Sequence, residues 1–172
     1  MKHSYYEASA RERVDALLDP LSFREILPPT ARVVSPHLTA LDLPTAFDDG
    51  VVIGSGALEG RAVLIAAQEG GFMGGAVGEV HGAKIVGLLA RARKVRPRAV
   101  LLLVDSGGVR LHEANAGLIA IPEIMRAVLD VRAAGVPVLA EPADQPWGDR
   151  IAYVEDPEGN PVMLCAELSA EG

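Results

Sequence analysis

Two glycine-rich bends carry the residue types in this chain that are best suited to chemistry. Gly74 and Gly75 lie within QEGGFMGGAVG, and Gly107 and Gly108 lie within DSGG. Each bend follows an apolar run and precedes a helix-compatible segment, so the sequence predicts strand, bend and helix twice. Glycine permits a tight turn with bare N–H groups, and the following helix adds the positive end of its dipole. Each bend is therefore a candidate for stabilising negative charge on an oxygen; for either bend alone, a purely structural turn is the favoured alternative.

Charged residues flank both bends. Arg110 and Lys84 are candidates for binding a carboxylate or the phosphates of a pantetheine-type arm. The alternative, equally supported, is a surface ion pair with Glu113 or Glu79. Ser106 lies on a strand-to-helix turn, but its D-S-G-G context differs from the G-x-S-x-G pattern of a serine nucleophile, which favours a backbone role.

His81 and His112 are the histidines of the two glycine-rich segments. Either is a candidate proton donor to a carbanion, because an unperturbed imidazole titrates near pH ~6.5. Local capping or packing is the favoured alternative for each.

The elements that must position these residues follow from periodicity and from turn residues. Residues 100–104 form an unbroken apolar run, which predicts a strand buried on both faces. Glu59-Gly60 predicts a hairpin turn, and Gly135 predicts a helix cap. The expected elements are strands at 51–58, 61–68 and 136–140, helices at 7–18, 21–27, 79–94 and 111–134 (with a new start or a kink at Pro122), an irregular arm at 30–47, and a hairpin of 150–155 with 161–167 around the turn 156–160.

Composition indicates one globular, aliphatic-rich protein. The chain has 172 residues, of which 49% are hydrophobic and 4% aromatic, and its net charge of -7 disfavours a nucleic-acid-binding face. The single Cys165 excludes an internal disulfide and fits a reducing compartment. Neither a signal-peptide core nor an apolar run of membrane-spanning length is found, so we expect a soluble cytoplasmic protein with no membrane partner.

With these segments in view, residues 1–140 resemble the β subunit of biotin-independent malonate decarboxylase, in the acyl-CoA carboxyltransferase branch of the crotonase-like superfamily. The resemblance rests on EASARERVDALLDPLSFRE and on two blocks, F-M-G-G…G-E-V-x-G-x-K and S-G-G-x-R-x-x-E, in that order and spacing. It covers roughly four-fifths of the chain. It implies an α/β fold of the crotonase-like (ClpP/crotonase) ββα-spiral type.

The resemblance also implies a reaction. A malonyl thioester on an acyl carrier protein would lose CO2 and leave an enolate, stabilised by an oxyanion hole of backbone N–H groups from Gly107, Gly108, Gly74 and Gly75. No cofactor would be bound directly; a CoA-derived (phosphoribosyl-dephospho-CoA) prosthetic group would sit on the carrier protein. The implied partners are a γ subunit and that carrier protein, in a hetero-oligomer for malonate catabolism.

The last residues differ in character. Segments 146–153 and 156–165 resemble the terminal hairpin of a glyoxalase or vicinal-oxygen-chelate domain, so we expect a boundary near 141 between residues 1–140 and a tail, 141–172. In that family the metal-binding carboxylate falls where Met163 stands, and turn formation explains the acidic residues better than a metal site. The tail leaves open a truncated spiral with weak activity, a non-catalytic interaction subunit, or a fragment of a metal-dependent lyase.

Overall fold

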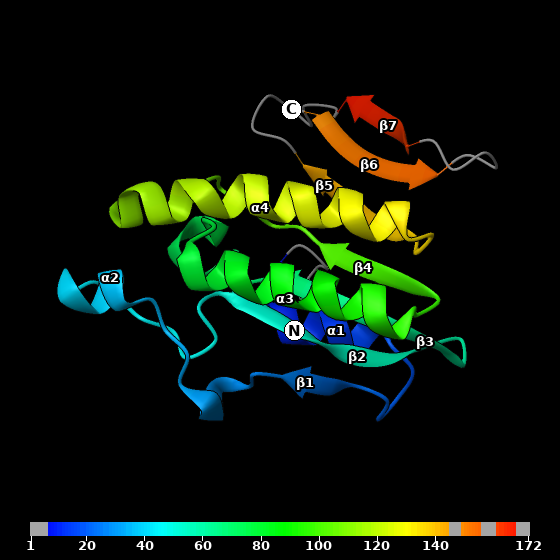
Figure 1. The fold of residues 1–172 in the computed structure, drawn as a ribbon, viewed down its shortest axis with the longest axis horizontal. Helices are drawn as coiled ribbons and strands as arrows, with labels where there is room; N and C mark the ends of the chain where they lie inside the picture. The colour runs from blue at the N-terminus through cyan, green and yellow to red at the C-terminus, as the bar shows by residue number, and fades with distance from the viewer. Residues whose placement is uncertain (1–6, 145–148, 156–160, 168–172) are drawn as a thin grey trace.

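A single seven-stranded sheet organises the molecule, in the order β1-β2-β3-β4-β5-β6-β7 (Figure 1). The computed structural model describes residues 7–144, 149–155 and 161–167, with side chains as far as Pro137. The central neighbours β3–β4 and β4–β5 are parallel, whereas the other pairs are antiparallel. The strands are β1 (Arg24–Ile26), β2 (Val51–Leu58), β3 (Arg61–Gln68), β4 (Ala99–Leu103), β5 (Val138–Asp144), β6 (Asp149–Glu155) and β7 (Pro161–Glu167).

Helices lie on both faces of this sheet. They are α1 (Ala10–Leu17), α2 (Pro36–Ala40), α3 (Glu79–Val95) and α4 (Ala114–Ala133), with short 3-10 turns η2 (Pro29–Ala31), η3 (Met73–Gly75) and η4 (Leu111–Glu113). A capping box starts α1, since the Ser9 side chain accepts from the Glu12 N–H and the Glu12 carboxylate accepts from the Ser9 N–H. None of the described helices has the length and apolar character needed to cross a membrane.

Strand alternation divides the core into two layers, because successive side chains point to opposite faces. Helices α3 and α4 cover one face and α1 the other (Figure 1). The first layer includes Val51, Ile53, Leu64, Ala66 and Val100 with Leu88, Leu89 and Val131 of the helices. The second includes Val52, Val63, Ile65, Leu101 and Leu103 with Ala10 and Val14. The prediction of an α/β fold, with β4 covered on both faces, is confirmed.

Several predicted elements need correction. Residues 21–27 do not form a helix: β1 occupies Arg24–Ile26 because it pairs antiparallel with β2, a long-range contact that outweighs a short local pattern. The arm at 30–47 is not wholly irregular, since Pro36 starts α2. Pro122 does not start a new helix, since it lies inside α4. The last parallel strand spans 138–144 rather than 136–140.

The C-terminal hairpin is confirmed as an antiparallel pair, β6 with β7, and its predicted turn at 156–160 lies outside the described residues. β6 also pairs antiparallel with β5, which itself crosses residue 141. The hairpin therefore continues the same sheet.

Candidate functional site

The two glycine bends meet at one edge of the sheet. β3 and β4 run parallel, with Ala67 opposite Leu103, so their carboxyl ends and the bends that follow lie side by side. The Gly107 N–H donates to the Gly74 carbonyl at 2.8 Å, and the Val77 N–H donates to the Gly108 carbonyl at 2.8 Å. The arrangement expected from the repeated strand–bend–helix pattern is thus observed.

Close backbone contact explains why these positions are glycine. A Cβ on Gly75 would collide with the Asp105 carbonyl oxygen, and one on Gly107 would collide with the Gly74 carbonyl oxygen. Gly75 also has a φ of +70°, which side chains of L-residues rarely adopt. Gly74 and Gly108 have positive φ as well, but a Cβ at either would meet nothing within 4 Å. Gly75 and Gly107 therefore allow the two bends to pack together, whereas Gly74 and Gly108 face open space.

The four amides are not equally available to a ligand. The Gly107 and Gly75 N–H groups donate to the carbonyls of Gly74 and Phe72, at 2.8 and 3.0 Å. This corrects the expectation that all four serve an oxyanion, because those two donors are already used. The Gly108 N–H makes a 3.2 Å bond to Ser106 Oγ, a residue of its own turn. Within the described residues the Gly74 N–H has no acceptor, and both Gly74 and Gly108 are exposed.

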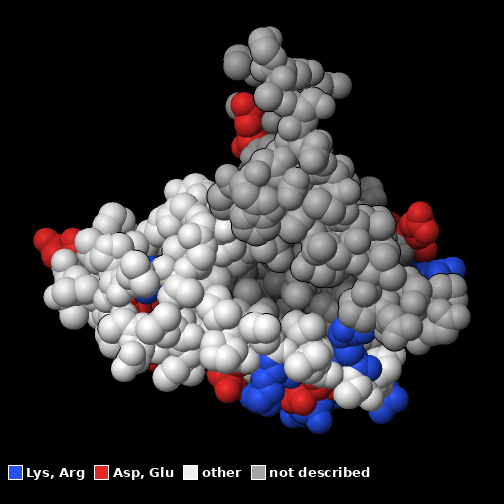
Figure 2. All heavy atoms as spheres, turned by 90° about the horizontal axis from the view of Figure 1, so that it is seen from above, with Lys and Arg blue, Asp and Glu red and all other residues white. Residues whose placement is uncertain are grey.

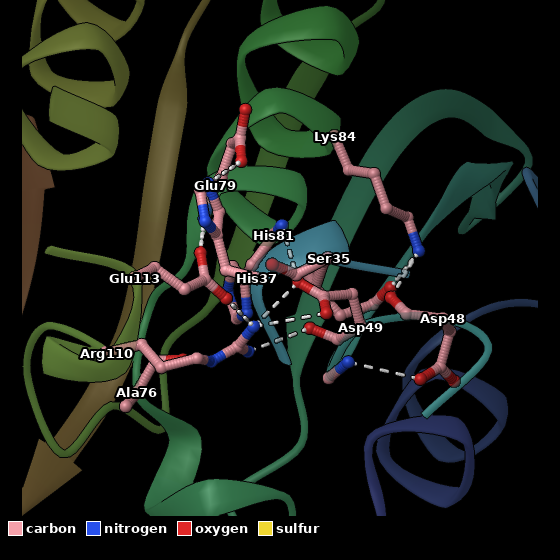
Figure 3. A network of polar contacts seen from close by, with 12 residues as sticks. Ser35, His37, Asp48, Asp49, Ala76, Glu79, His81, Lys84, Arg110 and Glu113 are labelled. Atoms are coloured by element: carbon pink, nitrogen blue, oxygen red, sulfur yellow. Dashed lines mark hydrogen bonds and ion pairs between the residues drawn. The ribbon is translucent and has the colours of Figure 1, made fainter. Parts of the chain in front are cut away.

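A buried ion cluster holds the bends in place (Figure 3). Arg110 Nη1 lies 2.8 Å from Glu113 Oε1 and 2.9 Å from Asp49 Oδ2, and all three side chains are 0% exposed. Arg110 Nη2 donates to the carbonyls of Ala76 and Asp49, at 3.2 and 3.3 Å. The guanidinium also lies 5.2 Å from the centre of the Phe72 ring. The Arg110 side chain, from the second bend, therefore contacts both the first bend and Asp49, which lies just before β2.

The two carboxylates of the cluster respond differently to burial. Burial raises the pKa of Asp49 above its ordinary value, although the Arg110 charge partly offsets this effect. Burial also acts to raise the pKa of Glu113, but hydrogen bonds from the Glu79 N–H and from Arg110 outweigh it and hold that pKa below its ordinary value. Both are acceptors for Arg110, which makes this cation a structural one and corrects the expectation that it binds substrate.

Lys84 is buried as well. Its Nζ donates to the carbonyls of Asp48, at 2.8 Å, and Val51. Burial lowers the pKa of Lys84, and the nearby carboxylates of Asp48, Glu25 and Asp49 oppose that shift. Lys84 thus anchors α3 to the start of β2. Neither a phosphate contact nor a surface ion pair with Glu79 is available to it in this arrangement.

His81 is fully buried and holds one tautomer. Gln68 Oε1 accepts from the Asp105 N–H at 2.9 Å, so the Gln68 amide nitrogen must donate to His81 Nε2, 2.9 Å away. The ring proton then sits on Nδ1, which has no partner among the described residues. Burial, followed by the charges of Arg110 and Lys84, lowers the pKa of His81 to about 3. An imidazole that is 0% exposed, with its Nε2 already bonded to Gln68, is a poor proton donor to a substrate, which corrects one of the two histidine assignments. His112 is exposed and stays a prediction.

An apolar cavity of about 190 Å³ opens beside the second bend, between α4 and the ends of β3 and β4. Its wall includes Ser106, Gln68, Val104, Ile121, Ile124 and Met125. The exposed Gly108 belongs to the same turn as Ser106. The cavity therefore places an apolar wall beside the turn that carries the Gly108 N–H.

Sequence reasoning missed two members of this site. Asp49 lies in an Asp-Asp-Gly run typical of a turn, and nothing local indicates that it meets a cation 61 positions away. Gln68 gave a usable signal: it is the single polar residue ending an apolar strand, and such a buried amide needs partners.

No group of three or more potential metal ligands occurs in the part of the chain whose side chains the structure describes. The acidic residues considered for a metal in the tail lie outside that part.

Comparison with known proteins places this geometry in a family. Residues 2–140 match the carboxyl transferase domain. The chain is 38% identical over 152 residues to the malonyl-S-ACP:biotin-protein carboxyltransferase MADC of Malonomonas rubra, covering 80% of this chain and 47% of the relative. It superposes on a Pseudomonas malonate decarboxylase hetero-tetramer, solved in complex with malonate, with a TM-score of 0.76 and 47% identity, over 80% of this chain and 51% of that one.

A more distant relative is the transcarboxylase 12S core, with a TM-score of 0.67 and 33% identity over 77% of this chain and 25% of that one. The chain spans about half the length, or less, of these relatives. The crotonase-like fold predicted for residues 1–140 is confirmed by this match. Since the matched region exceeds four-fifths of the sequence, the chain belongs to the carboxyl transferase domain family.

Proposed function

We propose that this chain supplies the oxyanion-stabilising half of a malonate decarboxylase β subunit, acting on a malonyl thioester carried by an acyl carrier protein. The observation that carries the proposal is the pairing of two glycine bends beside an apolar cavity. Among the described residues the Gly74 N–H has no acceptor, and the Gly108 N–H bonds only the Ser106 hydroxyl of its own turn, at 3.2 Å. The similarity to the malonyl-S-ACP carboxyltransferase and to the malonate decarboxylase hetero-tetramer supports the choice of substrate class.

The proposed chemistry needs little from the side chains. Loss of CO2 breaks the bond between the carboxylate carbon and the α-carbon, and the electron pair moves onto the thioester oxygen as an enolate. Backbone N–H groups aimed at that oxygen favour the charged state, and they do so most strongly in a site that excludes water. Gly74 and Gly108 are the donors we assign to this role. His112 remains a candidate donor of the proton that later converts the carbanion to the acetyl thioester.

The partners form part of the proposal. Solved relatives include malonate decarboxylase hetero-dimers and hetero-tetramers, which supports a hetero-oligomer. We propose that a γ subunit and a carrier protein bearing a phosphoribosyl-dephospho-CoA group complete the site, in the cytoplasm.

The test is CO2 release from malonyl-loaded carrier protein, with the γ subunit present. Replacing the Gly74 or Gly108 amide by an ester, through a genetically incorporated α-hydroxy acid, removes the N–H and keeps the backbone shape. Loss of one oxyanion donor should slow the reaction by about 10²–10³-fold. The matched control is an ester at Gly71, in the first bend's own loop, whose N–H bonds only Glu69 at 3.2 Å.

Retention of the full rate by both esters would refute the assignment of the donors. Absence of CO2 release from a folded chain with both partners would instead favour a non-catalytic interaction subunit. Bound divalent metal in the purified protein, needed for activity, would favour the metal-dependent lyase.

A further inference from the structure

A second hollow lies at the opposite end of the sheet from the glycine bends. It has a volume of about 550 Å³ and lies where α3 ends and β4 begins. We call it the basic hollow; its wall includes Arg91, Arg96 and Arg98, with Ser22, Ser55 and Pro97. Helix α3 leads from the first bend to this hollow, and its 17 residues correspond to about 25 Å. The hollow is therefore distinct from the candidate active site.

The charges of the basic hollow are not neutralised within the fold. Three exposed arginines of its wall form no ion pair with any described residue: Arg91, Arg96 and Arg98. The carboxylate of Asp19, which contacts the lining residue Gly60, accepts from the N–H groups of Glu59 and Gly60, at 2.9 and 2.7 Å, and forms no ion pair with these arginines. The chain as a whole has a net charge of -7, so the hollow is a local site of positive charge on an acidic protein. Figure 2 shows Lys and Arg side chains, with Asp and Glu among them, along one edge of the face in view.

Helix electrostatics explain only part of this pattern. A cation near the end of α3, such as Arg93, is favoured by the helix dipole, and Arg93 also contacts Asp130. Arg96, by contrast, is the C-cap with a φ of +47°, where glycine or asparagine is the favourable residue. Arg98 lies beyond the helix. Local structure thus gives no reason for arginine at these two positions.

We propose that the basic hollow binds a small molecule bearing a phosphate or diphosphate group. Guanidinium groups match phosphate oxygens in bidentate geometry, and the Ser55 hydroxyl adds a polar partner. Ala62, Val63 and Val95 give the wall an apolar part for an organic body attached to the phosphate. The volume falls within the range of small-molecule sites, of about 300–1,000 Å³. An acidic protein would instead need an extended surface of about 800 Å².

The test uses the full chain and calorimetric titration with pyrophosphate and with ADP. We expect saturable binding of ADP at a single site, weakened by added salt because the contacts are exposed. Arg91→Gln and Arg98→Gln should each weaken the affinity about tenfold, the size of one lost charge-assisted hydrogen bond. Arg96→Gly removes a guanidinium at a position where glycine suits the backbone, so it keeps the proposal testable if another variant unfolds.

Arg93→Gln is the matched control, since Arg93 lies on the same helix, is exposed, and does not line the hollow. It should change the affinity less than twofold. Three results would overturn the proposal: no saturable binding of either probe, equal losses in the Arg91 and Arg93 variants, or binding of poly-glutamate with no binding of ADP. Because these are binding measurements on the chain alone, they are independent of the proposed decarboxylation.

Discussion

Replacing Arg110 by Met tests how strongly the buried ion cluster holds the two bends. Met is similar in length and apolar, so the substitution removes the charge with little change in volume. It deletes bonds to Asp49 at 2.9 and 3.1 Å and to Glu113 at 2.8 Å, and leaves two carboxylates with 0% exposure facing each other without a cation. Removing one partner of a buried pair costs about 3–5 kcal/mol, because the remaining charge stays desolvated.

The assay is urea unfolding at pH 7, followed by circular dichroism, with Arg126→Met as the matched control. Arg126 also bridges two carboxylates, Glu123 at 2.6 Å and Asp130 at 3.1 Å, but its side chain is 58% exposed. We expect little measurable change in the control, because water screens exposed pairs. We expect the free energy of unfolding to fall by about 3–5 kcal/mol in Arg110→Met.

Acid should partly restore the variant. Without Arg110, the pKa of Asp49 rises further in the folded state, since that cation lowers it in the native protein. A group whose folded-state pKa is raised contributes stability below its unfolded pKa and loses it as pH rises through the folded pKa. The deficit of the variant should therefore shrink between pH 7 and pH 5, and Asp49→Asn with Glu113→Gln should recover much of it. A loss of stability no larger than that of Arg126→Met would refute the role of the buried ion cluster in holding the bends.

Three further predictions concern neighbouring features. Folding lowers the pKa of His81 from 6.5 to about 3, so its contribution to stability is fully present above pH 6.5 and is lost as pH falls toward 3. Between pH 7 and pH 5 the native protein should therefore lose about 2 kcal/mol of unfolding free energy that His81→Gln does not lose. Urea titrations at each pH measure this difference. Gly75→Ala should destabilise the fold by about 1–3 kcal/mol more than Gly74→Ala, since only the first Cβ meets backbone; equal thermal melts would contradict this packing. Ser9→Ala should cost about 1 kcal/mol through loss of the capping box of α1, and Ser9→Thr should retain most of that stability in the same melts.

The sequence by itself determined the central elements, β2, β3, α3 and β4, and the meeting of the bends. Apolar segments on either side of the Glu59-Gly60 turn specify the hairpin of β2 and β3. Apolar runs ended by Gly or Pro specify α3 and β4, because these signals act over a few residues. Two parallel strands that end in glycine must place their bends at the same sheet edge. The family motifs, which overlap those bends, carried the assignment to carboxyl transferases.

Tertiary structure decided what the side chains do. The sequence suggested the pair of Arg110 and Glu113, yet only packing shows that it is buried and shares Asp49, because burial depends on α3, α4 and β2 closing around it. The same holds for β1, whose three residues form a strand only through pairing with β2. Spacing along the chain predicts which groups can meet, whereas desolvation decides whether a cation such as Arg110 or Lys84 binds a ligand or stabilises the fold.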